Sequence, residues 1–144
     1  MAIQTTYGTN IGPAFEGMIA DSRDQEVESR SVETAAGIGF GKVVVKGTTD
    51  DQVRVSEAAR AFVGITVAEH GQAADLYPQY STCSVLRRGA IWVQASVAVA
   101  TEDPVYFVPA TGVLTNVATS NTALPDATWR TSTTGAGLAV VRFG

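Results

Sequence analysis

Side chains that could perform chemistry are scarce in this sequence, which contains one histidine, His70, and one cysteine, Cys83. A hydrolytic triad needs a nucleophile, a base and an orienting group, so every such scheme would have to use His70 as its base. His70 lies beside Gly71 in a polar stretch that holds no supporting motif. We therefore interpret it as a surface loop residue rather than a catalytic base or a metal ligand.

Cys83 has no second cysteine with which to form a disulfide inside the chain. No basic residue stands next to it to activate the thiol. We predict a small buried apolar side chain in a protein made in a reducing cytosol, with a reactive thiol as the alternative. The first residues lack the cationic start and apolar run of a signal peptide, and no segment reaches the ~20 apolar residues of a membrane span.

Two further patterns look like ligand sites but lack essential parts. Residues 37–41, GIGFG, look like a phosphate loop, yet they lack its spacing and its Lys-Ser/Thr ending. Asp50 and Asp51 could bind calcium, but no further oxygen donors follow at loop spacing, which favours a simple turn. The other acidic residues cluster in turns and in the leading segment, which disfavours a glycosidase-like carboxylate pair. The sequence predicts neither enzymatic activity nor a metal or cofactor.

The net charge of −4 is concentrated at the start of the chain. Residues 1–33 hold six acidic and two basic side chains, which accounts for the whole excess, while residues 34–144 balance at eight and eight. Nucleic-acid binding requires a clustered basic face, and Arg87-Arg88 is the only basic doublet. We expect no nucleic-acid partner.

The stretch from Gly89 to Thr115 contains the clearest strand pattern in the sequence, and we interpret the rest of the fold from it. Apolar side chains occupy one parity over many positions, as strand residues that face a core do, namely Ile91, Val93, Ala95, Val97 and Val99. Residues 43–45, a run of three valines, predict a strand buried on both faces. With turn-like clusters between such runs, the sequence predicts an all-β fold, a compact β-barrel or sandwich of about eight or nine short strands.

The N-terminal part differs from this body in composition. Residues 1–20 interleave glycines with apolar residues, which fits either a strap across the chain's own domain or an arm on a neighbouring subunit. Residues 21–34 are dense in charge and predict a solvated connector, with an electrostatic contact surface as the alternative. We therefore divide the chain into an extended arm and acidic connector, residues 1–34, and a β-barrel or sandwich body, residues 35–144.

Several stretches taken in order resemble the structural cement proteins of tailed-bacteriophage capsids. They are AFEGMIADS at 14–22, GIGFGKVV at 37–44, FVGI at 62–65, VLRRGAIWV at 85–93, DPVY at 103–106, ATW at 127–129 and GLAVV at 137–141. The resemblance spans nearly the whole chain, and the order and spacing of glycines and apolar positions carry it. The chain departs from the pattern at residues 101–103 and in the length of the 70–80 loop.

The resemblance implies a decoration protein on the outer surface of a phage head, made in the bacterial cytoplasm, that bridges subunits of the major capsid protein. It carries over no catalytic residue. We expect a homotrimer, with a dimer as second choice. Eight residues are predicted to contact a neighbouring subunit or the capsid, the first four as apolar anchors and the last four as acidic partners of a basic surface: Ile11, Phe15, Met18, Ile19, Asp21, Asp24, Glu26 and Glu28.

Two other functions remain open at this point. Another virion β-domain, such as a tail tube or spike tip, would also oligomerise without catalysis. A carbohydrate-binding domain could use Trp92 and Trp129 as stacking platforms, although packing between sheets or subunits is the favoured interpretation of both tryptophans.

Overall fold

The computed structural model describes residues 14–55, 60–71 and 74–144, and these form eleven β-strands and no helix. The predicted all-β class is confirmed, although the two longest strands have 14 residues each. The strands are β1 (Ile19–Val32), β2 (Ile38–Gly39), β3 (Val43–Lys46), β4 (Gln52–Arg54), β5 (Phe62–Thr66), β6 (Leu76–Tyr77), β7 (Thr82–Ala95), β8 (Pro104–Phe107), β9 (Leu114–Thr115), β10 (Thr122–Trp129) and β11 (Gly137–Phe143).

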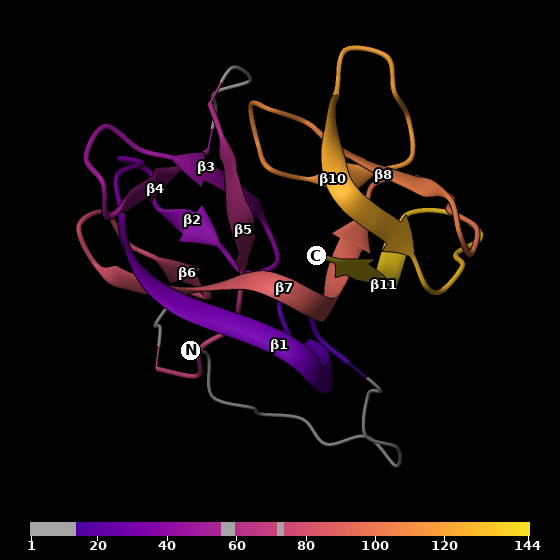
Figure 1. Cartoon of the computed structure of the whole chain (residues 1–144), viewed down its shortest axis with the longest axis horizontal. Coiled ribbons are helices and arrows are strands. Elements are labelled where there is room, and N and C mark those ends of the chain that lie inside the picture. The colour runs from indigo at the N-terminus through magenta and orange to yellow at the C-terminus, as the bar shows by residue number, and fades with distance from the viewer. Residues whose placement is uncertain (1–13, 56–59, 72–73) are drawn as a thin grey trace.

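Nine strands form one sheet in the order β1-β4-β3-β5-β7-β11-β10-β8-β9, and β2 pairs with β6 in a second, two-stranded sheet. Two additional pairings, β1 with β7 and β7 with β9, fold the large sheet into two rings of strands that share β7. Figure 1 shows these rings as an indigo-to-magenta half and an orange-to-yellow half. Because a single residue pair, Ala95 with Leu114, joins β7 to β9, the architecture is sandwich-like rather than a closed barrel.

Strand β7 contributes to a separate core in each half. Cys83 and Val85 pack in the smaller core, whereas Ile91, Val93 and Ala95 pack in the larger one, and all five are at most 1% exposed. The alternation seen in the sequence therefore places one set of side chains inside, as strand geometry requires. The strand ends at Ala95, earlier than the alternation to residue 99 predicts.

Gly89 marks the point where β7 passes from one ring to the other. β5 pairs with Val85 and Leu86 before Gly89, β11 pairs with residues 89–95, and β1 pairs with residues on both sides of Gly89. Gly89 has a φ of 132°, in a region that side chains with a Cβ rarely adopt, and an added Cβ would lie 3.4 Å from the Cα of Gln25. The backbone conformation, rather than lack of space for a Cβ, thus favours glycine where β7 changes direction.

Strand β3 separates the two cores. Val43 and Val45 face the larger core and Val44 faces the smaller one, with exposures of 2% or less. The prediction that the valine run is buried on both faces is confirmed. Val32 of β1 is also fully buried in the smaller core, so the end of β1 is anchored in the body.

The end of β7 can be tested with two valines of the same parity, Val93 at 0% exposure and Val97 at 36%. We expect Val93→Ala to lower the free energy of unfolding by about 2 kcal/mol, because it removes buried methyl groups and leaves a cavity. Val97→Ala should change it by less than about 0.5 kcal/mol. Urea unfolding followed by tryptophan fluorescence measures both, and equal losses would contradict the assigned end of the strand.

Candidate binding surface

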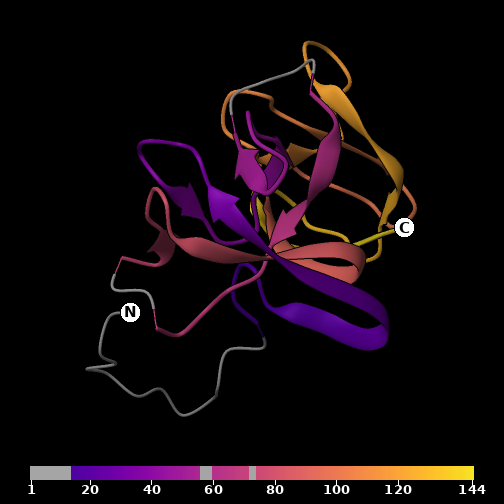
Figure 2. The same ribbon diagram turned by 60° about the vertical axis from the view of Figure 1, so that its left-hand side comes forward.

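Strand β1 carries most of the residues predicted to contact a partner. Both ribbon views show it running along β7 on the outside of the molecule (Figure 1, Figure 2). It pairs antiparallel with β7 from Ile19 opposite Ile91 to Ser31 opposite Thr82, with register shifts between Ile19 and Val27. The connector predicted for residues 21–34 is therefore a paired strand over most of its length. Polar side chains do not prevent this, because the backbone groups of β7 supply the hydrogen bonds.

The four predicted apolar anchors have different environments. Ile11 lies outside the described residues. Phe15 is 44% exposed and contacts the His70 ring edge-on, with the ring centroids 5.7 Å apart. Met18 and Ile19 are half-buried, and the Met18 carbonyl accepts a hydrogen bond of 2.8 Å from the backbone N–H of Trp92. Of the three described anchors, Phe15 is the most available to a partner.

Arginines neutralise three of the four predicted acidic contact residues. Asp21 accepts hydrogen bonds from Arg23 at the backbone N–H (2.9 Å), at Nε (2.9 Å) and at Nη2 (2.7 Å). These bonds from the Arg23 side chain and backbone hold the pKa of the Asp21 carboxyl below its ordinary value. Asp24 lies 3.7 Å from Nη2 of Arg142 on β11.

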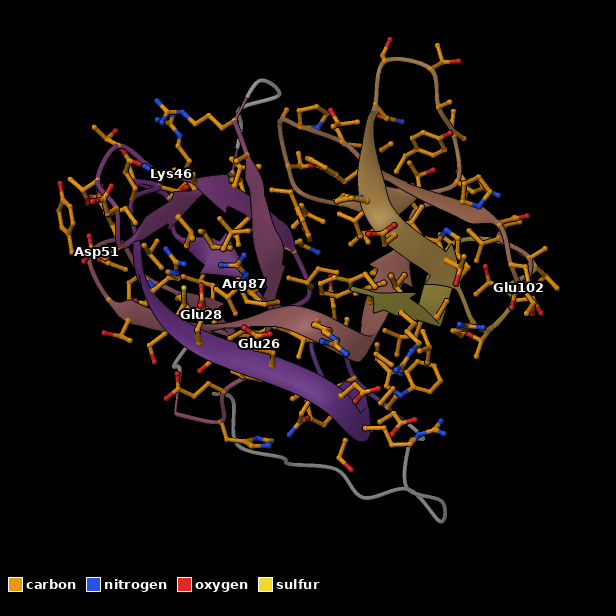
Figure 3. All side chains as sticks on the ribbon, viewed as in Figure 1. Glu26, Glu28, Lys46, Asp51, Arg87 and Glu102 are labelled. Carbon is orange, nitrogen blue, oxygen red and sulfur yellow. The ribbon has the colours of Figure 1, made fainter. Side chains whose placement is uncertain are left out.

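Glu28 accepts hydrogen bonds from Arg30 Nε at 2.6 Å and from Arg87 Nη1 at 3.1 Å. Partial burial raises the pKa of Glu28, but the two guanidinium groups outweigh burial and the net pKa is lowered. Glu26 is exposed and has no ion pair among the described residues. Figure 3 shows Glu26 and Glu28 along β1, with Arg87 beside Glu28. Glu26 is therefore the predicted acidic residue with its charge free for a partner.

Sequence reasoning missed the arginines that pair with these acidic residues. Arg87 and Arg142 lie far from β1 in sequence, and sheet pairing brings them beside it. The sequence held one indication of these pairs. Residues 34–144 contain eight basic side chains, which could pair with the acidic residues of the leading segment.

The remaining candidate residues offer little reactivity. Cys83 is buried, and burial raises the pKa of its thiol to about 11, so the reactive alternative is contradicted. Trp129 is fully buried and cannot serve as a stacking platform, while Trp92 is half-buried. His70 is exposed in the loop between β5 and β6.

In the part of the chain that the structure describes, no group of three His, Cys, Asp or Glu side chains could hold a metal ion, and no helix is long and apolar enough to cross a membrane.

The described residues thus form an all-β body with a charged outer strand. The model of the family described as "Structural cement protein (E217 gp24/Pam3 gp6)" matches residues 3–144. The chain belongs to this family of phage structural cement proteins, whose role is to decorate and stabilise a capsid.

One solved structure from a phage capsid has a similar fold. A chain of "The capsid of Myoviridae Phage XM1" superposes with a TM-score of 0.77 at 18% identity, covering 99% of this chain and 97% of that chain. The head fibre gp8.5 N base of bacteriophage phi29 gives a TM-score of 0.48 at 10% identity, covering 83% of this chain and 94% of that one. No curated protein matches the chain significantly.

The Glu28 ion pairs should make stability depend on acid pH. Because the pKa of Glu28 is lowered on folding, its pairs stabilise the protein above the ordinary value of 4.5 and are lost as the pH falls through the folded value. At pH 7 we expect Glu28→Gln to cost about 1 kcal/mol. We further expect this difference from the parent to shrink as the pH falls below 4.5.

Glu26→Gln is the matched control, because it changes the same charge on the same strand without breaking an ion pair among the described residues. Thermal unfolding of the three proteins across acid and neutral pH measures the effect. A stability difference between Glu28→Gln and the parent that stays constant through this range would argue against the ion-pair assignment.

Proposed function

We propose that this protein decorates the exterior of a phage head, where it binds the major capsid protein and bridges neighbouring subunits of the expanded shell. The observation that carries the proposal is the family match over residues 3–144. The similarity of fold to a chain in the capsid of phage XM1, over 97% of that chain, is consistent with it. This function needs no catalysis, and we propose that the protein is not an enzyme.

The physical basis is binding to one state of the shell. A protein that binds the expanded shell better than its precursor stabilises the expanded form by mass action. A site of micromolar affinity contributes about 8 kcal/mol at standard state, and an icosahedral shell repeats the site many times. A body with two packed cores joined through β7 can hold its contact residues in fixed positions.

We propose that residues 1–34 make the contacts and that residues 35–144 form the supporting body. Within the first segment, Phe15 and Glu26 are the best placed, because Phe15 is 44% exposed and Glu26 has no ion pair among the described residues. Met18 and Ile19 are half-buried. We keep them as secondary contacts, together with Ile11. We also propose that the protein assembles as a homotrimer at local three-fold axes, with a dimer at two-fold axes as the alternative. We propose that it is synthesised in the bacterial cytoplasm.

The direct test is to mix the purified protein with undecorated mature capsids and to image the particles by electron microscopy. We expect saturable density on the outer surface between capsid subunits, and a higher temperature of capsid disruption. The same sample reports the oligomeric state from the number of copies in each density. Absence of binding to capsids, or labelling of the tail on complete virions, would refute the proposal.

Phe15 can be tested against an exposed aromatic residue elsewhere, Tyr80, which is 74% exposed in the turn before β7. We expect Phe15→Ala to weaken capsid binding about tenfold, because exposed aromatic anchors dominate the energetics of interfaces. Tyr80→Ala should bind as the parent does. Occupancy measured over a range of protein concentrations gives both affinities, and equal affinities for the two variants would exclude Phe15 as an anchor.

A further inference from the structure

A groove of about 550 Å³ lies beside β1 and gathers three arginines from separate parts of the chain. Arg23 comes from β1, Arg142 from β11 and Arg130 from the residue after β10. The groove is also lined by small or aliphatic side chains, among them Ala90 and Val140. Its volume lies in the range of sites that bind small molecules or peptide side chains. We call it the arginine groove.

The hydrogen-bonding capacity of these arginines is largely unused. Each guanidinium has five N–H donors. Arg130 donates one hydrogen bond of 3.0 Å to Glu102. Arg142 is 28% exposed, and its ion-pair partner Asp24 lies 3.7 Å away, beyond hydrogen-bonding distance. Within the described residues the Arg142 guanidinium makes no hydrogen bond, and because Arg142 lines the groove, its N–H donors remain available to a ligand there.

Each arginine of the groove has an acidic partner, but the three pairs differ in how closely they are held. Its lining holds three arginines against two aspartates. Asp21 uses both carboxylate oxygens on Arg23. Glu102, outside the lining, pairs with Arg130 at 3.0 Å, whereas the exposed Asp24 lies 3.7 Å from Arg142, so Arg142 is the most weakly paired arginine of the groove. A partly enclosed guanidinium without a hydrogen-bonded partner favours an incoming carboxylate, which can accept two parallel N–H bonds from one arginine.

The backbone of β1 opens this groove. The pairing of β1 with β7 slips between Asp21 and Glu26, and Asp24 has a φ of 54°. Such bulges bend a strand away from its partner and often lie next to functional sites. The short side chains of Ala20 and Ala90 also line the groove.

We propose that the arginine groove receives the carboxylate of an acidic side chain from the major capsid protein. This inference rests on the proposed capsid-binding function and specifies the chemistry of the partner. It extends the proposed contact surface from residues 1–34 to the body, and it reverses part of the charge pattern expected from the sequence, because the surface beside acidic β1 binds an acidic group through Arg130 and Arg142.

The test compares two cations that are equally exposed and similarly paired. Arg130 is 46% exposed and pairs with Glu102, while Lys46 is 48% exposed and pairs with Asp50 in the other half of the molecule. Figure 3 shows Lys46 and Glu102 at opposite ends of the molecule. We expect Arg130→Gln and Arg142→Gln each to weaken binding to undecorated capsids about tenfold and to flatten its salt dependence. Lys46→Gln should bind as the parent does.

Arg142→Lys separates charge from geometry. Lysine keeps the positive charge but lacks the planar fork, so we expect an affinity between those of the parent and Arg142→Gln. If the parent binds capsids and both glutamine variants bind equally well with the same salt dependence, the groove inference fails while the proposed function stands. If the parent itself does not bind, the proposed function fails.

A second measurement uses no capsid. The Nε–Hε signals of the arginines are followed by NMR during titration with an acetylated tetraglutamate peptide, and in a separate arm with inorganic phosphate. We expect the peptide to shift the signals of Arg130 and Arg142 but not that of Arg87, whose guanidinium pairs with Glu28 outside the groove. No response to the peptide, or a response to phosphate alone, would overturn the assignment to a carboxylate.

Discussion

The structure depends on the burial of β7 side chains in both hydrophobic cores. Cys83 and Val85 fill one core and Ile91, Val93 and Ala95 fill the other, so a single strand joins two rings that would otherwise be separate sheets. A glycine in the middle of β7 allows the change of direction between the rings. Because both halves share this strand, a force applied to one half is transmitted to the other, which suits a protein that stabilises a shell.

The outer strand β1 shows how a charged segment can be part of such a fold. Its backbone pairs with β7, and its acidic side chains meet arginines supplied by β1, β7 and β11. Each exposed pair contributes little to stability alone. Their larger effect is on the surface, because they remove the negative charge that the sequence displays at Asp21 and Glu28 and leave it at Glu26.

The surface of the described residues is consistent with membership of a structural family. The thiol of Cys83 is buried and protonated at neutral pH, and the indole of Trp129 is enclosed in the larger core. Phe15 is exposed and Arg142 is partly exposed, and aromatic and arginine side chains are enriched in protein interfaces. The cement family therefore agrees with the surface as well as with the fold.

The sequence by itself determined the all-β class, the burial of residues 43–45 and of Cys83, and the inward set of β7, because side-chain alternation is a local property of a strand. It did not determine that residues 19–32 are a strand, since pairing of the backbone with β7 leaves no mark on polar side chains. The neutralisation of Asp24 by Arg142 and the arginine groove were decided by tertiary structure alone. Register and sheet order bring these charges together, and neither can be derived from spacing along the chain.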